Sequence, residues 1–286
     1  MNTIGRALTG AAALGIERID AQLLLLHALG RARHDRAWLL AHDSDALPPE
    51  AARTFSLLCA RRTRGEAVAY LIGEKEFYGL RLMVDARVLI PRPDTETLVD
   101  WAIDVLAGLA APRVLDLGTG SGAIALAIQQ ARPDARVDAV DRSAGALEVA
   151  RANARALGLP VHFVQSDWLA GAAGPYQLIV SNPPYIAEGD PHLPALAHEP
   201  RDALVSGLSG LDDIRHIVRN ASAHLAAGGW LLLEHGHDQA AAVRALLAEN
   251  GFTQPKSHKD LSGIERCSGA QYDPVNNLHH FSGVFS

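Results

Sequence analysis

Residues 114–126 read VLDLGTGSGAIAL, and this stretch predicts how the larger part of the chain folds. A short apolar run ends at Leu117, glycines follow at Gly118, Gly120 and Gly122, and an apolar segment of helical composition comes next. A glycine-rich turn between a strand and a helix directs backbone N–H groups and a helix N-terminus at whatever lies above the sheet edge. We therefore predict an α/β domain with a ligand site over this loop.

The loop by itself does not identify the ligand. Gly118-x-Gly120-x-x-Ala123 also satisfies the looser dinucleotide fingerprint, so a nicotinamide cofactor and S-adenosylmethionine both fit it. Asp116 shifts the balance, because a carboxylate at the strand end suits the ammonium group of a methionine moiety and repels a pyrophosphate. The pattern favours an amino-acid nucleoside.

Two further strand ends carry candidate ligand contacts. Asp141 ends the next predicted strand, where its carboxylate can accept hydrogen bonds from both ribose hydroxyls, although Asp is also a favoured N-cap for the helix that follows. After the third strand, Asp167 offers an acceptor for an adenine amine, and Trp168 offers an apolar or stacking wall. A purely structural tryptophan is the alternative at that position.

The stretch LIVSNPPYIAE, residues 178–188, places a stiff turn after another apolar strand. Neither Pro183 nor Pro184 can donate a backbone hydrogen bond, so the strand must end there. A planar amide or aromatic amine is a poor nucleophile because its nitrogen lone pair is delocalised. The side-chain oxygen of Asn182 and the carbonyl of Pro183 can accept its two N–H bonds, and Tyr185 can lie against its plane. A plain strand-ending turn is the alternative.

The remaining sequence predicts two domains and a connector. Residues 1–73 have apolar positions at helical spacing and predict a small all-α domain, residues 74–92 a β-hairpin linker, and residues 93–269 a catalytic domain of alternating strands and helices. Such alternation implies a mostly parallel sheet covered on both faces. Within this domain, residues 211–226 and 239–250 predict amphipathic helices. Residues 270–286 lose all periodicity and predict an irregular tail.

Composition excludes several classes of protein. The 286 residues are 48% hydrophobic and carry a net charge of -6, which argues against affinity based on neutralising a nucleic-acid backbone. We see no membrane-spanning run or secretion signal. Cys59 and Cys267 lie far apart, which favours a reducing cytoplasm. The pair His235 and His237 lacks the partners of a metal site, so no metal is predicted.

The motifs taken together resemble a known family. The chain is similar to the HemK/PrmC family of peptide chain release factor glutamine methyltransferases over about residues 1–269. The motifs that carry the resemblance occur in order behind the helical N-terminal part: FYGL, LIPRPDTE, VLDLGTGSGAIAL, SNPPYI, HEPRDAL and KDLSGIER.

The resemblance implies a fold and a reaction. The fold is a seven-stranded Rossmann-like sheet of the S-adenosylmethionine-dependent methyltransferase type, with a helical N-terminal domain that docks the release factor. The reaction moves a methyl group from S-adenosyl-L-methionine, leaving S-adenosyl-L-homocysteine, to the amide nitrogen of the glutamine in the Gly-Gly-Gln loop of class 1 release factors. We therefore expect a cytoplasmic monomer with a protein substrate, no direct nucleic-acid contact and no membrane.

The resemblance also implies roles for residues. The loop from Gly118 to Gly122, with Thr119 and Ser121, would hold the methionine part of the cofactor, and Asn182 would border the cofactor and the substrate glutamine. The expected catalytic residues are Asn182, Pro183 and Tyr185, and Pro184 completes the substrate site. The segment with Arg92, Asp94, Thr95 and Glu96 lies near the active-site mouth in the family. The loop Glu199-Pro200-Arg201 either closes over substrate or is a plain surface loop.

Two other acceptors suit the same chemistry. A glutamine of a ribosomal protein would be served by the same fold and motifs, and an adenine amino group of DNA or RNA is also a planar amine. The nucleic-acid alternative predicts a basic recognition domain, which residues 1–73 do not provide. A third alternative is a cofactor-binding protein without turnover, which the intact set of candidate catalytic positions opposes.

Overall fold

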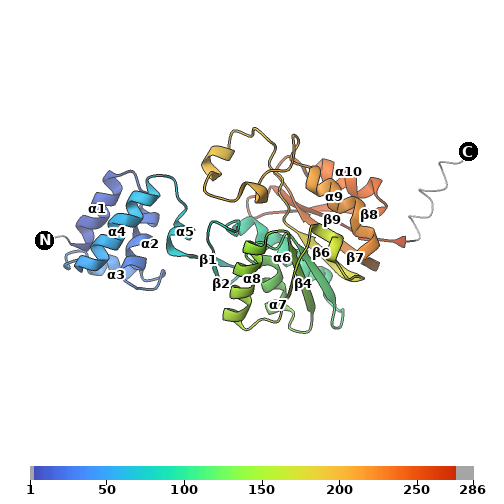
Figure 1. Ribbon diagram of the computed structural model, residues 1–286, viewed down its shortest axis with the longest axis horizontal. Helices are drawn as coiled ribbons and strands as arrows, with labels where there is room; N and C mark the ends of the chain where they lie inside the picture. The colour runs from blue at the N-terminus through green and yellow to red at the C-terminus, as the bar shows by residue number, and fades with distance from the viewer. Residues whose placement is uncertain (1–2, 275–286) are drawn as a thin grey trace, which may run out of the picture. The chain divides into compact units, whose positions relative to one another are not determined.

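A computed structural model describes residues 3–274 of the chain. The chain divides into two compact units, Met1–Glu74 and Lys75–Ser286 (Figure 1). Most of the predicted tail, from residue 275 to 286, lies outside the described residues. Within residues 3–274, no helix has both the length and the apolar character needed to cross a membrane.

The first unit is helical and is organised around one central helix. Helix α2 packs against all four other helices of the unit and buries Leu24, Leu25 and Leu26 completely. Arg62 at the end of the fourth helix donates to Asp20 at 2.8 Å, which ties the last turn of that helix to α2. The helices are α1 (Ile4–Ala13), α2 (Arg18–Ala28), α3 (Arg36–Ala41), α4 (Pro49–Arg62) and α5 (Val68–Ile72).

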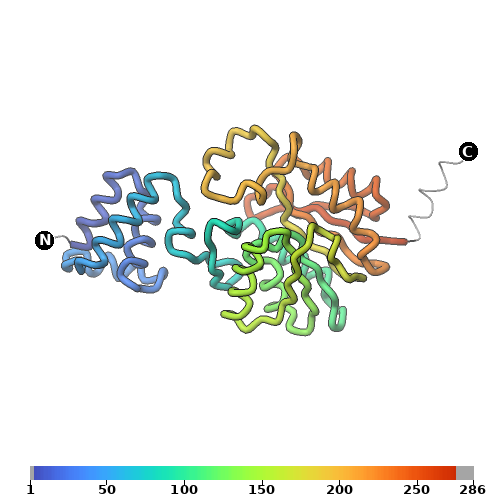
Figure 2. The backbone as a smooth tube through the Cα atoms, viewed as in Figure 1, coloured from blue at the N-terminus to red at the C-terminus, as the bar shows by residue number. Residues whose placement is uncertain are grey.

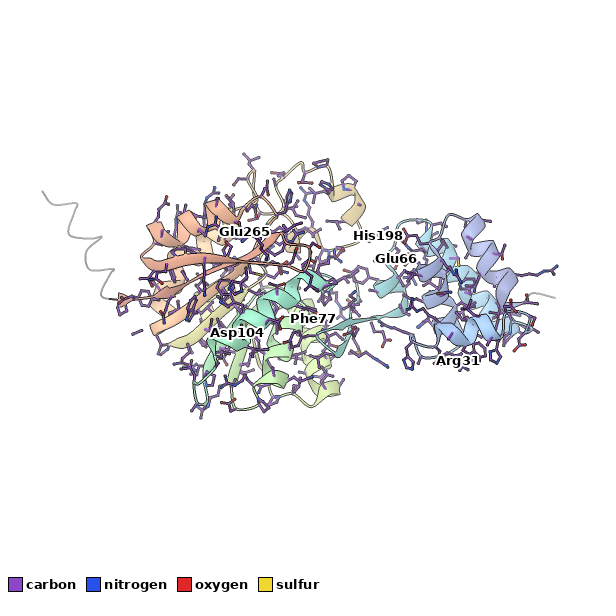
Figure 3. All side chains as sticks on the ribbon, turned by 180° about the vertical axis from the view of Figure 1, so that it is seen from behind. Arg31, Glu66, Phe77, Asp104, His198 and Glu265 are labelled. Atoms are coloured by element: carbon purple, nitrogen blue, oxygen red, sulfur yellow. The ribbon has the colours of Figure 1, made fainter. Side chains whose placement is uncertain are left out.

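A β-hairpin follows the helices, as the sequence predicts. Strands β1 (Glu74–Phe77) and β2 (Leu80–Met83) form a two-stranded sheet. Leu80 and Leu82 are buried while the residues between and after them are exposed, which is the alternation of a strand with one covered face. Phe77, labelled in Figure 3, is buried in the core of the second unit. The apolar side chains of the hairpin therefore anchor it to the core of the second unit.

The second unit contains a seven-stranded mixed sheet, so the predicted α/β fold is confirmed. Its strands lie in the order β5-β4-β3-β6-β7-β9-β8, and the last two pairings are antiparallel. The strands are β3 (Arg113–Leu117), β4 (Arg136–Asp141), β5 (His162–Gln165), β6 (Tyr176–Ser181), β7 (Leu225–Glu234), β8 (Phe252–Lys259) and β9 (Glu265–Tyr272). The helices are α6 (Glu96–Val105), α7 (Ala123–Ala131), α8 (Ala144–Leu157), α9 (Asp212–Ala221) and α10 (Ala240–Glu249).

Helices cover both faces of this sheet (Figure 1). Successive residues of the central strands belong to two different cores: Val114 packs in the cluster with α6 and α7, and Leu115 packs in the cluster with α9 and α10. In β6, Leu178 and Ile179 divide between the two clusters in the same way. A strand that is buried on both faces reads as a continuous apolar run, which explains the sequences of β3 and β6.

The connectivity creates one switch point in the sheet. The chain passes from β3 to β4 and β5 on one side and then returns, so that β6 pairs with β3 on the other side. Ligands of open α/β sheets bind outside the carboxyl ends of the strands at such a point. Figure 2 shows the long excursion of the backbone between β6 and α9, which leaves the sheet at this edge.

Two predicted boundaries are wrong. The tail predicted to begin at Ala270 still belongs to the sheet up to Tyr272, because β9 pairs there with both β7 and β8. The helix predicted for residues 211–226 is shorter, since α9 ends at Ala221 and β7 begins at Leu225. In both places pairing with strands distant in the sequence extends the sheet beyond what local periodicity indicates.

The close approach of β9 to its neighbours generates a test. A Cβ atom at Gly269 would meet the Leu231 carbonyl oxygen at 2.7 Å and Trp101 Cη2 at 3.0 Å. Gly269→Ala is therefore expected to lower the free energy of unfolding by about 3 kcal/mol, because overpacked side chains and backbone cannot relax. Gly263→Ala in the same hairpin has open space and only a positive φ of 81°, so its cost is about 1 kcal/mol. Equal losses in urea denaturation would contradict this account.

Candidate functional site

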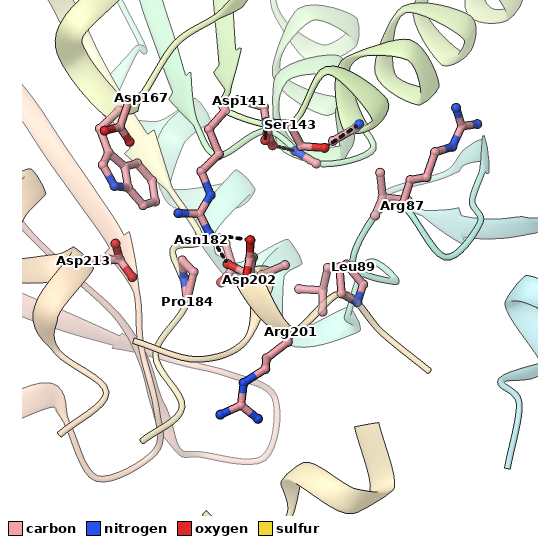
Figure 4. Close-up of a pocket in the computed structure, with 18 residues that line it drawn as sticks. Arg87, Leu89, Asp141, Ser143, Asp167, Asn182, Pro184, Arg201, Asp202 and Asp213 are labelled. Atoms are coloured by element: carbon pink, nitrogen blue, oxygen red, sulfur yellow. Dashed lines mark hydrogen bonds and ion pairs between the residues drawn. The ribbon is translucent and has the colours of Figure 1, made fainter. Parts of the chain in front are cut away.

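A cavity of about 660 Å³ opens at the carboxyl edge of the parallel strands. It lies at the switch point and is lined by the ends of β3, β4 and β6 together with the loop that follows Glu199 (Figure 4). Its volume falls within the roughly 300–1,000 Å³ typical of small-molecule sites. The predicted site residues that line it are Gly118, Gly120, Asp141, Asp167, Trp168, Asn182 and Pro184.

The glycine loop and Asp141 hold each other in place. Gly118 and Gly120 have φ values of 68° and 56°, which residues with a Cβ rarely adopt. The Gly120 N–H donates to Asp141 Oδ2 at 2.9 Å, and the Ser143 N–H donates to Asp141 Oδ1 at 2.8 Å. Because each carboxylate oxygen accepts more than one hydrogen bond, Asp141 can still receive two hydroxyl groups from the cavity.

Asp116 lies behind the loop and is fully buried. Its Oδ2 accepts from the Thr119 hydroxyl at 2.6 Å and from the Ala125 N–H at 3.2 Å, while Oδ1 has no hydrogen-bond partner among residues 3–274. Burial raises the pKa of Asp116 to about 7, although these two hydrogen bonds lower it. Asp116 fixes the loop and the start of α7, and its contact with a ligand ammonium stays a prediction.

Trp168 forms a flat wall against the glycine loop. Its backbone has a φ of 47°, a left-handed conformation that costs a non-glycine residue about 1–3 kcal/mol and is found at functional sites. A Cβ at Gly118 would lie 3.3 Å from Trp168 Cζ3, a tight contact that would make the indole shift slightly away from the loop. Asp167, labelled in Figure 4, lines the cavity beside the indole.

Asn182 is the first residue after β6, and its side chain is oriented by the start of α6. Asn182 Nδ2 donates to Thr95 Oγ1 at 3.2 Å. With the amide nitrogen engaged by Thr95, the amide oxygen remains as an acceptor, and Asn182 lines the same cavity as Asp141 and Trp168. Pro183 is buried, and Pro184 lines the cavity wall.

Tyr185 is tied to a buried acid at the end of β7. Its hydroxyl donates to Glu234 Oε1 at 3.3 Å. Burial raises the pKa of Glu234 to about 7, and the neighbouring Thr95 and Tyr185 side chains act in the opposite direction. Burial also raises the pKa of Tyr185, which is therefore a neutral phenol at physiological pH. Tyr185 does not line the cavity itself, and this differs from the predicted stacking position.

The loop containing Glu199 is anchored at its start and lines the cavity beyond. The buried carboxylate of Glu199 accepts from the Ile90 N–H at 3.1 Å and pairs with the guanidinium of Arg92. Pro200, Arg201 and Asp202 then line the cavity. Asp202 pairs with Arg142 at 3.1 Å, as the dashed lines of Figure 4 show. Glu199 itself does not line the cavity, and closure of this loop over a substrate stays a prediction.

Several predicted site residues lie outside the cavity wall. The predicted residues that do not line it are Asp116, Thr119, Ser121, Gly122, Pro183 and Tyr185. Sequence reasoning also missed residues. Glu234 carried a signal, since it is an acid at the carboxyl end of the apolar strand WLLLE. Arg87 and Val88 reach the cavity from the connector without motif character, and Leu89, which also lines the cavity, begins the LIPRPDTE motif.

The two histidines after β7 have different surroundings, since His235 is buried and His237 is exposed. His235 is buried, with Nε2 2.7 Å from the Ser268 hydroxyl and Nδ1 2.9 Å from the Gly236 carbonyl oxygen. Burial lowers the pKa of His235, so it is neutral at physiological pH. Across residues 3–274 no group of three or more histidine, cysteine or acidic side chains is arranged to hold a metal ion.

Comparison with known proteins first identifies the general class of protein to which this chain belongs. A solved structure of a methyltransferase from Pyrococcus furiosus shares the fold, with a TM-score of 0.53, 20% identity, and coverage of 76% of this chain and 99% of that chain. Residues 97–207 match the family described as the methyltransferase small domain. The chain therefore has a methyltransferase fold and contains a methyltransferase small domain.

Closer relatives define the family. Residues 4–73 match the PrmC N-terminal domain. The release factor glutamine methyltransferase of Burkholderia pseudomallei is 50% identical over 267 residues, which is 90% of this chain and 92% of the relative. That of Bordetella pertussis is 49% identical over 89% of this chain and 95% of the relative. The chain belongs to the release factor glutamine methyltransferase family.

The buried Asp116 makes stability depend on pH. Because its folded pKa of about 7 exceeds the ordinary 3.8, the folded protein binds this proton more tightly than the unfolded chain between these values. The free energy of unfolding therefore loses about 1.4 kcal/mol per pH unit from this group as pH rises through that range. Asp116→Asn is expected to remove this contribution. Urea denaturation at about pH 5 and about pH 7 measures both slopes, and identical slopes would refute the assignment.

Proposed function

We propose that this chain transfers a methyl group from S-adenosylmethionine to the side-chain amide nitrogen of the glutamine in the Gly-Gly-Gln motif of class 1 release factors. The names of its relatives support the substrate. The observation that carries the chemistry is the side chain of Asn182, which is held by Thr95 through its nitrogen and lines the cavity with Asp141 and Trp168. The acceptor is then a protein, and we expect the enzyme to act as a monomer in the cytoplasm.

The cavity residues fit S-adenosylmethionine, which supplies an electrophilic methyl group on a sulfonium. Asp141 offers carboxylate oxygens for the two ribose hydroxyls, and Trp168 offers an apolar plane for the adenine. Gly118 and Gly120 let the methionine part approach the backbone closely. The negative charge of Asp141 also suits a ligand that carries a positive one.

The residues after β6 suit a planar amide as the methyl acceptor. The Asn182 side-chain oxygen and the Pro183 carbonyl would accept the two N–H bonds of the glutamine amide and so aim the nitrogen at the methyl group. The N–C bond forms as the S–C bond breaks, and the displaced thioether leaves neutral. The extra proton then departs from the acidic nitrogen of the product, so a strong base is not required.

Mass spectrometry tests the substrate directly. Purified release factor is incubated with the protein and S-adenosylmethionine, and the added methyl group is located by fragmentation. We expect one methyl on the glutamine of the Gly-Gly-Gln motif. A methyl that is found only on a ribosomal protein, or only on nucleic acid, would overturn the proposed substrate.

Asn182→Ala separates catalysis from cofactor binding. We expect kcat to fall about 100-fold or more, because the variant loses an acceptor that aims the reacting nitrogen. The Kd for S-adenosylhomocysteine should stay within about threefold, as measured by calorimetry. A comparable loss of cofactor affinity would contradict a role at the acceptor amide.

Asp141→Asn should show the opposite pattern. Loss of the charged acceptor is expected to raise the Kd for S-adenosylhomocysteine about 10- to 100-fold, since hydrogen bonds to a charged group are worth about 1.5–3 kcal/mol. At saturating cofactor, kcat should fall less than in Asn182→Ala. An unchanged Kd would place the ribose elsewhere.

A further inference from the structure

The turn from Asn182 to Tyr185 has a stiff middle and therefore needs an anchor at each end. Pro183 and Pro184 have fixed φ angles and no N–H group, and a residue before proline is itself restricted, so the middle of the turn moves as one piece. Strand β6 and the hydrogen bond from Asn182 to Thr95 hold the first end. Because a stiff segment pivots about a single anchor, the position of the Pro183 carbonyl depends on what holds Tyr185.

The side chain of Gln239 holds this second end. Gln239 Nε2 donates to the Tyr185 carbonyl oxygen at 3.0 Å and to the carbonyl oxygens of Ser209 and Gly210 at 3.4 Å. Gln239 Oε1 accepts from the Gly236 N–H at 2.8 Å. A backbone N–H can only donate and a carbonyl oxygen can only accept, so these partners fix which way the amide faces. One side chain thus joins the turn after β6, the loop before α9 and the segment after β7.

Neither the helix that follows nor the cavity explains this glutamine. Gln239 directly precedes α10, at the position where Ser, Thr, Asp or Asn commonly caps a helix, but its side chain makes no capping hydrogen bond. Gln239 is also not among the residues that line the cavity. It can therefore influence the reaction only through the backbone groups that it holds.

The Tyr185 carbonyl is held in a crowded position. A Cβ atom at Gly210, where φ is 70°, would clash with that carbonyl oxygen and lie 2.8 Å from Gln239 Nε2, so the loop before α9 packs directly on the turn. On the other side of the same peptide bond, the Ile186 N–H donates to the Leu204 carbonyl oxygen at 2.8 Å. Because the peptide group is planar, both of its polar atoms together fix its orientation.

We infer that Gln239 is a positioning residue for methyl transfer, which holds the Tyr185 carbonyl and so fixes the stiff turn on which the acceptor amide binds. The inference rests on the proposed function, in which the Asn182 side chain and the Pro183 carbonyl bind that amide. Without the Gln239 donor, the turn pivots at its Tyr185 end and carries the Pro183 carbonyl away from the reacting nitrogen. A displacement of about 1 Å at such a group can slow a reaction about 100-fold.

Gln239→Glu in the full chain tests the donor with little change of shape. The carboxylate keeps an oxygen that accepts the Gly236 N–H, but its other oxygen cannot donate to Tyr185 at neutral pH. We expect kcat to fall about 10- to 100-fold. The Kd for S-adenosylhomocysteine should stay within about twofold, because Gln239 does not line the cavity. A wild-type kcat, or an equal loss of cofactor affinity, would overturn the inference.

A second variant and a matched control exclude effects of charge and of general destabilisation. Gln239→Met removes the donor without adding a charge and should lower kcat by a similar factor. Gln271→Glu makes the same amide-to-carboxylate change on β9, where Gln271 Nε2 donates to the Gly228 carbonyl oxygen at 2.7 Å. This control should leave kcat unchanged. A loss of kcat in Gln271→Glu as large as that in Gln239→Glu would overturn the inference.

The glycine that packs on the same carbonyl gives an independent route to the turn. Gly210→Ala should lower kcat at least about 10-fold, whereas Gly158→Ala, with a similar φ of 67° and open space around it, should leave kcat within about twofold. The double variant Gln239→Met/Gly210→Ala should be no more than about threefold slower than the slower single variant, because both displace the Tyr185 carbonyl. Multiplicative losses would overturn the inference.

A second readout does not depend on the substrate. In protein labelled with ¹⁵N-isoleucine, the backbone amide signal of Ile186 is identified by its absence in Ile186→Val. Its exchange with solvent hydrogen is expected to be several-fold faster in Gln239→Glu and in Gln239→Met than in wild type, because the peptide group has lost the partner of its carbonyl. Gln271→Glu should leave the exchange rate unchanged. Unchanged exchange in both Gln239 variants would overturn the inference.

The two readouts separate two kinds of failure. If the wild-type protein methylates no release factor, the proposed substrate is wrong, and amide exchange at Ile186 alone decides whether Gln239 fixes the turn. If the wild type methylates its release factor while Gln239→Glu retains both kcat and the protection of Ile186, the substrate stands and the role of Gln239 falls.

Discussion

The parallel register of β3, β6 and β7 is the constraint on which the rest of the site depends. Leu117 pairs with Ser181, and Ser181 pairs with Leu233, so three strands end side by side. The glycine loop, the Asn182 turn and Glu234 follow these ends directly. Because hydrogen bonds of the ladder fix the register, and a slip of one residue would exchange the two buried faces, the chemistry at this edge is positioned by the core.

Acidic side chains hold this edge together. Asp116 anchors the glycine loop through Thr119, Asp141 anchors the same loop through Gly120, and Glu199 anchors the following loop to the backbone of Ile90. Each acid accepts backbone or hydroxyl donors that strand ends and loops would otherwise leave unpaired. The site is thus a set of irregular loops whose polar groups are satisfied by carboxylates, and these hydrogen bonds hold the loops in position around the cavity.

Much of the fold could be predicted from the sequence, because its signals are local. The apolar run before Gly118 and the helix after Gly122 are adjacent in the chain, and α8 begins and ends where its periodicity does. The tail from Ala270 could not be predicted, since its strand character comes from pairing with β7 and β8. Likewise, the sequence places Glu234 at the end of an apolar strand, but its position beside Asn182 follows only from the pairing of β7 with β6.

The sequence by itself determined the class of fold, the glycine loop, and the residue types offered at each strand end, because these depend on periodicity and on the chemistry of single side chains. Only the tertiary structure decided which of those side chains face the cavity. It placed Asp141 and Trp168 on the wall, Asp116 behind the loop, and Thr95 against Asn182. The physical reason is that burial and hydrogen-bond partners are set by strand order and register, which bring together residues far apart in the chain.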